Sequence, residues 1–221
     1  MDDLIADFHI HSKYSHDSLM SPESIVKRAK KVGLTCIAVT DHGTIAGGIE
    51  AKRVAEKNGM KVVVGAEIKT DCGDIIGLNL HEEIESTLWQ EVIRAIRSQG
   101  GIVVLPHPYH DHTCVEEIAR CVDFIEIHNS RCTPNENSSA ELLAAEVKKK
   151  IIYGSDAHSL EEIGLVKIEV NPQSFDVRNV ICANKTSDWS LRKSQIISHM
   201  RKGEFRTLVK RGTGFLWKKR T

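Results

Sequence analysis

Short apolar runs alternate along this chain with segments in which apolar residues recur every three or four positions. The runs have the length of buried strands, and the segments between them have the spacing of amphipathic helices. We expect strands at residues 4–8, 36–39, 61–64, 74–80, 102–105, 124–127 and 151–153, with helices at about 22–32, 49–58, 87–97, 115–120 and 138–149. This alternation favours a mainly parallel α/β sheet covered by helices, either a closed barrel or an open doubly wound sheet.

Local signals define two connections. Ser21-Pro22 is typical of a helix N-cap followed by proline at the first helical position, and Gly33 is placed to end that helix. Asp71-Cys72-Gly73 is typical of a turn. It predicts a hairpin between the segment that contains Glu67 and the run 74–80.

Composition indicates a globular protein without membrane contact. Of 221 residues, 41% are hydrophobic and 27% charged, which suffices for a buried core. No apolar run approaches the roughly 20 residues that cross a bilayer. The acidic start at residues 1–4 lacks the basic flank of a secretory signal, so we expect a cytoplasmic location.

Charge divides the chain into an acidic domain, residues 1–200, and a basic C-terminal tail, residues 201–221. The tail holds eight of the 30 basic residues and one of the 30 acidic residues, which leaves a net charge of −7 on residues 1–200. A solvated end explains such a tail, and contact with an anionic partner such as nucleic acid is the alternative.

Six cysteines are present, at positions 36, 72, 114, 121, 132 and 182, and no two form a C-x-x-C pair. A zinc ribbon or a thioredoxin-type motif is therefore disfavoured. In a reducing compartment we expect buried or inert thiols.

Histidines and carboxylates gather where the expected strands end. Side chains alternate between the two faces of a strand, so His9 and His11 point the same way and can share a cation. Asp156 and His158 repeat this spacing after another strand. Three further strand ends carry Asp41-His42, Glu67 and His107. The carboxyl ends of parallel strands are where barrels and open α/β sheets hold active sites.

These side chains predict a metal centre. That many imidazoles and carboxylates would be costly to bury together without a cation. Nitrogen and oxygen ligands suit zinc, manganese or iron better than magnesium or calcium. Their number favours two or three ions, and a carboxylate such as Glu67 can bridge a pair. Paired ions clamp both oxygens of a phosphoester displacement and activate water as hydroxide, so no protein nucleophile is required.

The motifs together resemble the polymerase and histidinol phosphatase (PHP) family of metal-dependent phosphoesterases. They are Asp7-Phe8-His9-Ile10-His11-Ser12, Tyr14-Ser15, Asp17-Ser18, Thr40-Asp41-His42, Gly65-Ala66-Glu67, Pro106-His107-Pro108 and Gly154-Ser155-Asp156-Ala157-His158, in family order. The resemblance implies a distorted seven-stranded (β/α)7 TIM-like barrel. It also implies a first ion on His9, His11, Glu67 and Asp156, a second near Glu67 and His107, and a further ion on Asp17, His42 and His158. Asp41 is expected to orient an imidazole, with a turn carboxylate as the alternative.

One position departs from the family pattern. Many members carry a histidine where this chain has Asp74. Asp74 can bind the second ion, but it directly follows the expected turn, and we favour a side chain that does not reach inward. His81 is a weaker substitute.

Several other residues are weaker candidates for the site. Arg131, Asn129 and Lys13 are candidate phosphate-binding residues, since a guanidinium can contact phosphate through two hydrogen bonds. His128 has the opposite strand parity to Asn129, so a regular strand would not bring both to the site. We expect His110 and His112 to lie in a solvated loop.

The function that follows is hydrolysis of a small phosphomonoester by metal-activated hydroxide. A nuclease is the alternative, because the family includes domains that act on polynucleotides and the tail is basic. The acidic body disfavours a long nucleic-acid groove. An amidohydrolase usually bridges its ions with a modified lysine rather than a glutamate. A non-catalytic binding module would be expected to lack ligands that are present here.

Overall fold

The computed structural model describes residues 3–57 and 59–203. In that part, one sheet of nine strands has the order β7-β6-β5-β4-β3-β2-β1-β8-β9. The strands are β1 (Leu4–Asp7), β2 (Cys36–His42), β3 (Lys61–Thr70), β4 (Gly73–Leu78), β5 (Ile102–Leu105), β6 (Phe124–Asn129), β7 (Lys150–Gly154), β8 (Val166–Val170) and β9 (Val177–Ala183). The helices are α1 (Pro22–Lys31), α2 (Ala46–Glu56), α3 (Trp89–Ser98), α4 (Val115–Cys121), α5 (Pro134–Val147) and α6 (Asp188–Arg201).

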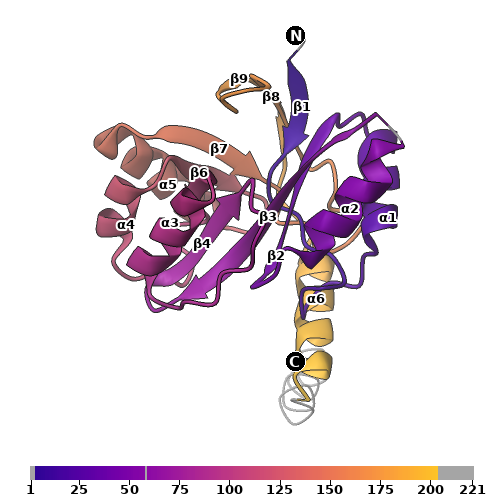
Figure 1. Ribbon diagram of the computed structural model, residues 1–221, viewed down its shortest axis with the longest axis horizontal. Coiled ribbons are helices and arrows are strands. Elements are labelled where there is room, and N and C mark those ends of the chain that lie inside the picture. Colours follow the sequence, from indigo (N-terminus) through magenta and orange to yellow (C-terminus); the bar gives the residue numbers. More distant parts are fainter. Residues whose placement is uncertain (1–2, 58, 204–221) are drawn as a thin grey trace, which may run out of the picture.

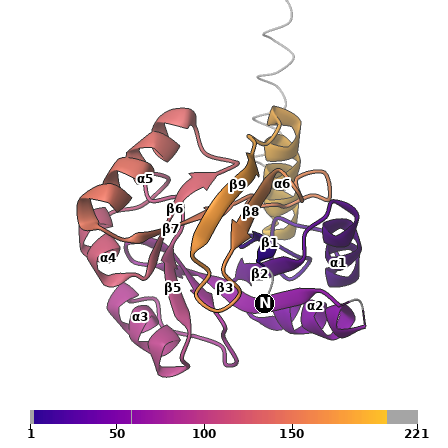
Figure 2. The ribbon, with the colours of Figure 1, turned by 90° about the horizontal axis from the view of Figure 1, so that it is seen from above.

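The sheet curls into a nearly closed barrel. Strands β1 to β7 follow one another in chain order, and the segments that follow β1 and β7 meet in a parallel bridge between Ile10 and Ala157. The His11 N–H donates to the Ala157 carbonyl over 2.9 Å. Viewed from above, α3, α4 and α5 lie outside this ring on one side and α1 and α2 on the other (Figures 1 and 2). The α/β class and the barrel shape are confirmed.

Two details of the expected barrel are wrong. The sheet has nine strands rather than seven, because β8 and β9 add an antiparallel hairpin to the free edge of β1. The sheet is also mixed rather than mainly parallel, since β4 runs antiparallel to both β3 and β5. The β3–β4 pair is the hairpin that the turn at residues 71–73 predicts.

Side-chain alternation builds the core in layers. On β2, Cys36 and Ala38 join the cluster inside the ring, whereas Ile37 and Val39 pack in an outer cluster with residues of α1. Helix α1 begins as expected, with the Ser21 hydroxyl accepting a hydrogen bond from the Ser24 N–H over 3.2 Å. No helix in residues 3–57 and 59–203 is long and apolar enough to cross a membrane.

The expectation of six unpaired thiols is wrong for two of them. Cys72, in the β3–β4 turn, forms a disulfide with Cys114, at the start of α4. The two residues are 42 positions apart, so only the fold brings their Cα atoms to 5.8 Å. Cys36 and Cys132 are free and buried. Most of the predicted basic tail, residues 204–221, lies outside the described residues.

Candidate metal centre

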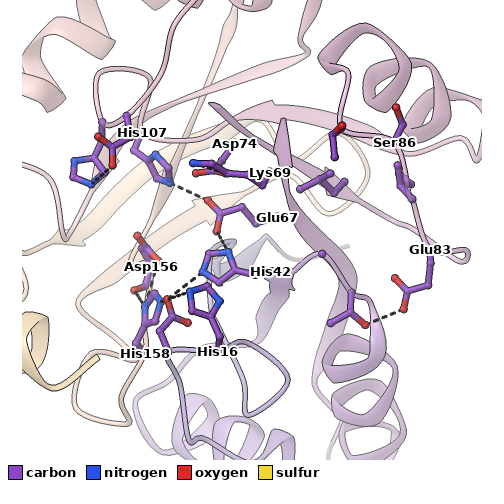
Figure 3. A pocket seen from close by; sticks show the side chains of 18 of the residues that line it. His16, His42, Glu67, Lys69, Asp74, Glu83, Ser86, His107, Asp156 and His158 are labelled. Atoms are coloured by element: carbon purple, nitrogen blue, oxygen red, sulfur yellow. Dashed lines mark hydrogen bonds and ion pairs between the residues drawn. The ribbon is translucent and has the colours of Figure 1, made fainter. Parts of the chain in front are cut away.

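All eight predicted metal ligands converge at one mouth of the barrel. Figure 3 shows His42, Glu67, His107, Asp156 and His158 among them. They form overlapping groups whose ligand atoms lie within 4.8 Å of one another. The groups are His11, Asp17, His42 and His158; His9, His11 and Glu67; His9, His107 and Asp156; and Glu67, Asp74 and His107. Because neighbouring groups share residues, this geometry suits several adjacent ions rather than one.

Strand geometry explains the convergence. Ile10 packs in the outer cluster beside α1, while the flanking His9 and His11 face the mouth. His42 and Glu67 are register partners on β2 and β3, so their side chains are adjacent. His107 and Asp156 have φ angles of 28° and 51°. Such left-handed backbone is uncommon outside glycine and concentrates at functional sites.

Glu67 occupies the centre of the cluster. Its Oε1 is 2.9 Å from His107 Nε2, and its Oε2 is 3.1 Å from His42 Nδ1 and 3.4 Å from His11 Nε2. One carboxylate oxygen therefore faces His107, and the other faces His42 and His11. A carboxylate placed in this way could contact two ions.

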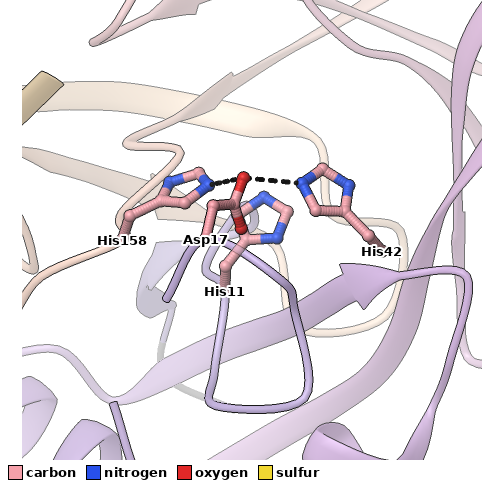
Figure 4. Close-up of side chains that lie close together, drawn as sticks. All are labelled: His11, Asp17, His42 and His158. Carbon is pink, nitrogen blue, oxygen red and sulfur yellow. Dashed lines mark hydrogen bonds and ion pairs between the residues drawn. The ribbon is translucent and has the colours of Figure 1, made fainter. Parts of the chain in front are cut away.

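Asp17 joins two imidazoles on the other side (Figure 4). Its Oδ2 is 3.2 Å from His42 Nε2 and 3.1 Å from His158 Nε2. His158 Nδ1 lies 2.8 Å from the Asp156 carbonyl, which can only accept, so this nitrogen carries a proton. In the neutral ring the Nε2 lone pair then points at the Asp17 carboxylate, which is favourable only when a cation lies between them.

Supporting residues fix the inner imidazoles. His9 Nδ1 is 3.0 Å from Glu126 Oε1, which leaves Nε2 directed at the cluster. The Ser15 hydroxyl donates to Asp41 over 2.7 Å and lies 3.1 Å from His11 Nδ1. Asp41 therefore contacts the His11 ring only through Ser15, and it also accepts hydrogen bonds from the Ser12 N–H and hydroxyl. Its orienting role stays a prediction.

Charge compensation dominates the electrostatics. Burial lowers the pKa of His9, but the carboxylates of Asp156, Glu126 and Glu67 outweigh it and raise that pKa well above its ordinary value. His107 behaves similarly: burial opposes protonation, but its hydrogen bond to Glu67 brings the pKa to about 9. Burial and the neighbouring His158 and His42 lower the pKa of His11 to about 3. Protons on selected imidazoles thus balance the carboxylates, a task that divalent cations can perform.

Buried atoms without hydrogen-bond partners are a second sign, beside the charge balance, that these residues fit a bound metal. Among the described residues, Asp17 Oδ1, Asp156 Oδ1 and His107 Nδ1 are buried without a hydrogen-bond partner. Buried polar atoms of folded proteins are normally paired. Three unpaired ligand-type atoms within one cluster of imidazoles and carboxylates are therefore consistent with cation binding.

Asp74 lies closer to the centre than its place beside the turn led us to expect. Its carboxylate is within 4.8 Å of ligand atoms of Glu67 and His107, and it also faces Lys69 Nζ at 3.7 Å. The expectation that it does not reach inward is wrong. β4 begins at Gly73, so Asp74 already has the register of the strand. His81 is exposed and outside the candidate groups.

The three candidate phosphate ligands are placed differently. Arg131 lines the cavity, but it pairs with Glu162 at 2.9 Å and also bonds Ser194 of α6. Asn129 donates to Glu126 and Asp156, so it positions carboxylates. Lys13 is exposed, pairs with Glu50 and does not line the cavity.

The remaining histidines follow the expected pattern in part. A register shift between Glu126 and His128 leaves Asn129 at the site, while His128 stacks on Tyr153. His110 is exposed, as a solvated loop implies. His112 is half-buried, with Nε2 2.9 Å from the Asp74 carbonyl, so the solvated-loop expectation is wrong for it.

Two residues near the cluster were missed from the sequence. Glu126 is buried and contacts His9, and its place two residues after the inward-facing Phe124 was a signal that strand alternation could have used. The His16 ring lies beside that of His42, with a centroid distance of 4.8 Å and a tilt of 31°, but His16 is in a loop where no periodicity marks it.

The cluster forms the floor of a cavity of about 1050 Å³. Its walls include the loop at residues 83–87, the charged side chains of Lys69 and Arg131, and Lys202, which follows α6. A cavity of this size accommodates a small organic substrate.

Comparison with known proteins points to one family. Residues 7–158 match the model of the PHP domain, and residues 134–186 match the PHP-associated model. An uncharacterized protein of Methanocaldococcus jannaschii is 46% identical over 115 residues, which cover 47% of this chain and 67% of that protein. A 5'-3' exoribonuclease of Haemophilus influenzae is 33% identical over 105 residues, covering 44% of this chain and 37% of the enzyme.

A solved structure shares the fold. It is a two-domain protein from Bacteroides vulgatus that contains a predicted PHP-like metal-dependent phosphoesterase. The TM-score is 0.67 at 20% identity, and the match covers 87% of this chain and 69% of that protein.

Proposed function

This chain belongs to the PHP domain family, a family of metal-dependent phosphoesterases, and on that premise we propose that it hydrolyses a small phosphomonoester. The observation that carries the proposal is the convergence of eight imidazoles and carboxylates at one mouth of the barrel, where six of them line the cavity. Two or three divalent transition-metal ions, of zinc, manganese or iron, fit this donor set.

We assign the ligands as the resemblance to the PHP family implies. His9, His11, Glu67 and Asp156 would hold the first ion, while Asp17, His42 and His158 would hold another. Glu67 would extend to a further ion together with His107 and Asp74. Two groups of ligand atoms within 4.8 Å support these assignments, namely His9, His11 and Glu67, and Glu67, Asp74 and His107. Asp156 is grouped with His9 and His107, and its Oδ1 is 3.1 Å from His11 Nε2. The group of Asp17, His42 and His158 also includes His11.

When bound, the ions would supply Lewis acidity that lowers the pKa of a water molecule and stabilises charge on the phosphoryl group. The protein's own contribution is orientation. Glu126 fixes the His9 ring, and Asp41 acts on the His11 ring through Ser15. Arg131, on the cavity wall, would offer positive charge to the substrate phosphate while Glu162 holds its guanidinium.

A phosphatase screen tests the proposal directly. Metal-depleted protein would be reloaded with Mn²⁺ or Zn²⁺ and assayed for phosphate release from a panel of phosphomonoesters. We expect turnover that chelation abolishes and metal restores, and that Asp156→Ala lacks. Turnover that persists after verified metal removal, or absence of turnover on every phosphoester at full metal loading, would refute it.

A nuclease is the second candidate. The similarity to a 5'-3' exoribonuclease favours it, although the match covers under half of either chain. The net charge of −7 on residues 1–200 disfavours a long polynucleotide groove. Turnover of nucleoside monophosphates should be compared with that of single-stranded oligonucleotides on the same metal-loaded protein. A clear preference for oligonucleotides would select the nuclease.

A further inference from the structure

A second group of metal-ligating side chains lies beside the main cluster. His110 is in the loop after β5, Cys132 is in the connection from β6 to α5, and Glu136 is in the first turn of α5. One ligand atom of each residue lies within 4.8 Å of the other two. None of the three is among the ligands assigned above.

The helix start holds the carboxylate of this group in place. Glu136 Oε2 accepts a hydrogen bond from the Thr133 N–H over 2.6 Å, as part of the α5 capping box. Its other oxygen, Oε1, is 3.4 Å from His110 Nδ1. One oxygen is therefore fixed by the cap, and the other remains directed at the imidazole.

The sulfur is the unusual member of the group. Cys132 is only 5% exposed, forms no disulfide, and its Sγ makes no hydrogen bond within residues 3–57 and 59–203. Burial and the carboxylates of Glu126 and Glu136 raise the pKa of its thiol. A cation would offset those negative charges and release the thiol proton, as metal binding to cysteine requires.

We propose that His110, Cys132 and Glu136 bind a divalent cation of the zinc type, separate from the ions of the main cluster. Imidazole, thiolate and carboxylate are the three ligand types that zinc takes in proteins, and three protein ligands leave a fourth position open. His110 lines the cavity, so this ion would lie at the cavity wall, within reach of a substrate oxygen or water.

Cobalt substitution tests the site without relying on catalysis. The main cluster contains only nitrogen and oxygen ligands, so a thiolate-to-cobalt charge-transfer absorption reports the proposed site alone. Full-length protein would be depleted of metal, titrated with Co²⁺, and followed by absorption and by metal counting. Cys132→Ser, His110→Ala and Glu136→Gln would be compared with Cys121→Ser, which removes a half-buried thiol elsewhere.

We expect the charge-transfer absorption in wild type and in Cys121→Ser, and its loss in Cys132→Ser. His110→Ala and Glu136→Gln should weaken cobalt binding at this site at least tenfold. His110 is exposed and glutamine also supports a capping box, so both variants should fold even if Cys132→Ser does not. No thiolate absorption in wild type, its persistence in Cys132→Ser, or unchanged affinity in both other variants would overturn the proposal. Phosphatase activity enters none of these readouts.

Discussion

Glu126→Gln should weaken metal binding although Glu126 is not expected to touch an ion. The side chain is 2% exposed and accepts three hydrogen bonds. Oε1 is 3.0 Å from His9 Nδ1, while Oε2 accepts from the His107 N–H over 3.0 Å and from Asn129 Nδ2 over 2.9 Å. The substitution keeps the shape of the side chain but removes its charge and one of its two acceptor atoms.

The magnitude follows from those contacts. If the amide oxygen of glutamine keeps the two bonds made by Oε2, its NH₂ group must face the His9 Nδ1 proton. One hydrogen bond to a charged group is then lost, at a cost of about 1.5–3 kcal/mol. Because this bond fixes the His9 ring, we expect most of the loss to fall on metal affinity, which should drop by roughly 10- to 100-fold.

Competition between the protein and a chelating indicator measures this affinity for Zn²⁺ and Mn²⁺, with circular dichroism as a check of folding. Glu141→Gln is the matched control, since Glu141 is on the exposed face of α5. Wild-type affinity in folded Glu126→Gln would refute the orienting role, and an equal loss in Glu141→Gln would show that the effect is not local.

Three further outcomes are expected. Asp74→Ala should lose up to one equivalent of bound metal at limiting supply, as read by elemental analysis, and full retention would exclude Asp74 as a ligand. In the metal-free fold the pKa of His107 is raised from 6.5 to about 9. The resulting stabilisation is complete below pH 6.5 and is lost as pH rises toward 9. Urea unfolding of metal-free protein should therefore show up to roughly 3 kcal/mol of pH-dependent stability that His107→Gln lacks; equal slopes would contradict this. Gly154→Ala places a Cβ against Glu126 Oε1 and 2.6 Å from His9 Cβ, so the unfolding free energy should fall by about 1–3 kcal/mol. Unchanged stability would mean that this packing is loose.

Strand and helix positions were predictable where an apolar run or a helix cap marks the element. β5 has the expected bounds, and α1 begins at the expected proline, because apolar runs and caps are local signals. β9 and α6 escaped prediction for a physical reason. Every residue of β9 is half-buried or exposed, and the buried residues of α6 are Ser190 and Ser194, so neither element carries a buried apolar stripe.

The barrel mouth was predictable because several strand ends carry histidine or carboxylate side chains on the same side of the sheet. Asp74 was misjudged because its reach depends on where β4 begins, which the turn sequence does not specify to one residue. The disulfide between Cys72 and Cys114 depends on a contact between two distant loops. Spacing along the chain carries no information about such a contact.

Residues that support the cluster were harder to find than its ligands, and Glu126 and Ser15 indicate why. A ligand must present a particular atom to a cation, which restricts it to a few residue types on an inward-facing position. A supporting residue needs only to accept or donate one hydrogen bond, which serine, glutamate and backbone groups all do. Its position is constrained by the ring that it holds: Ser15 is placed by His11 and Asp41, and Glu126 by His9. The supporting role of such residues is therefore clearest once the ring nitrogen facing away from the cluster is located in three dimensions.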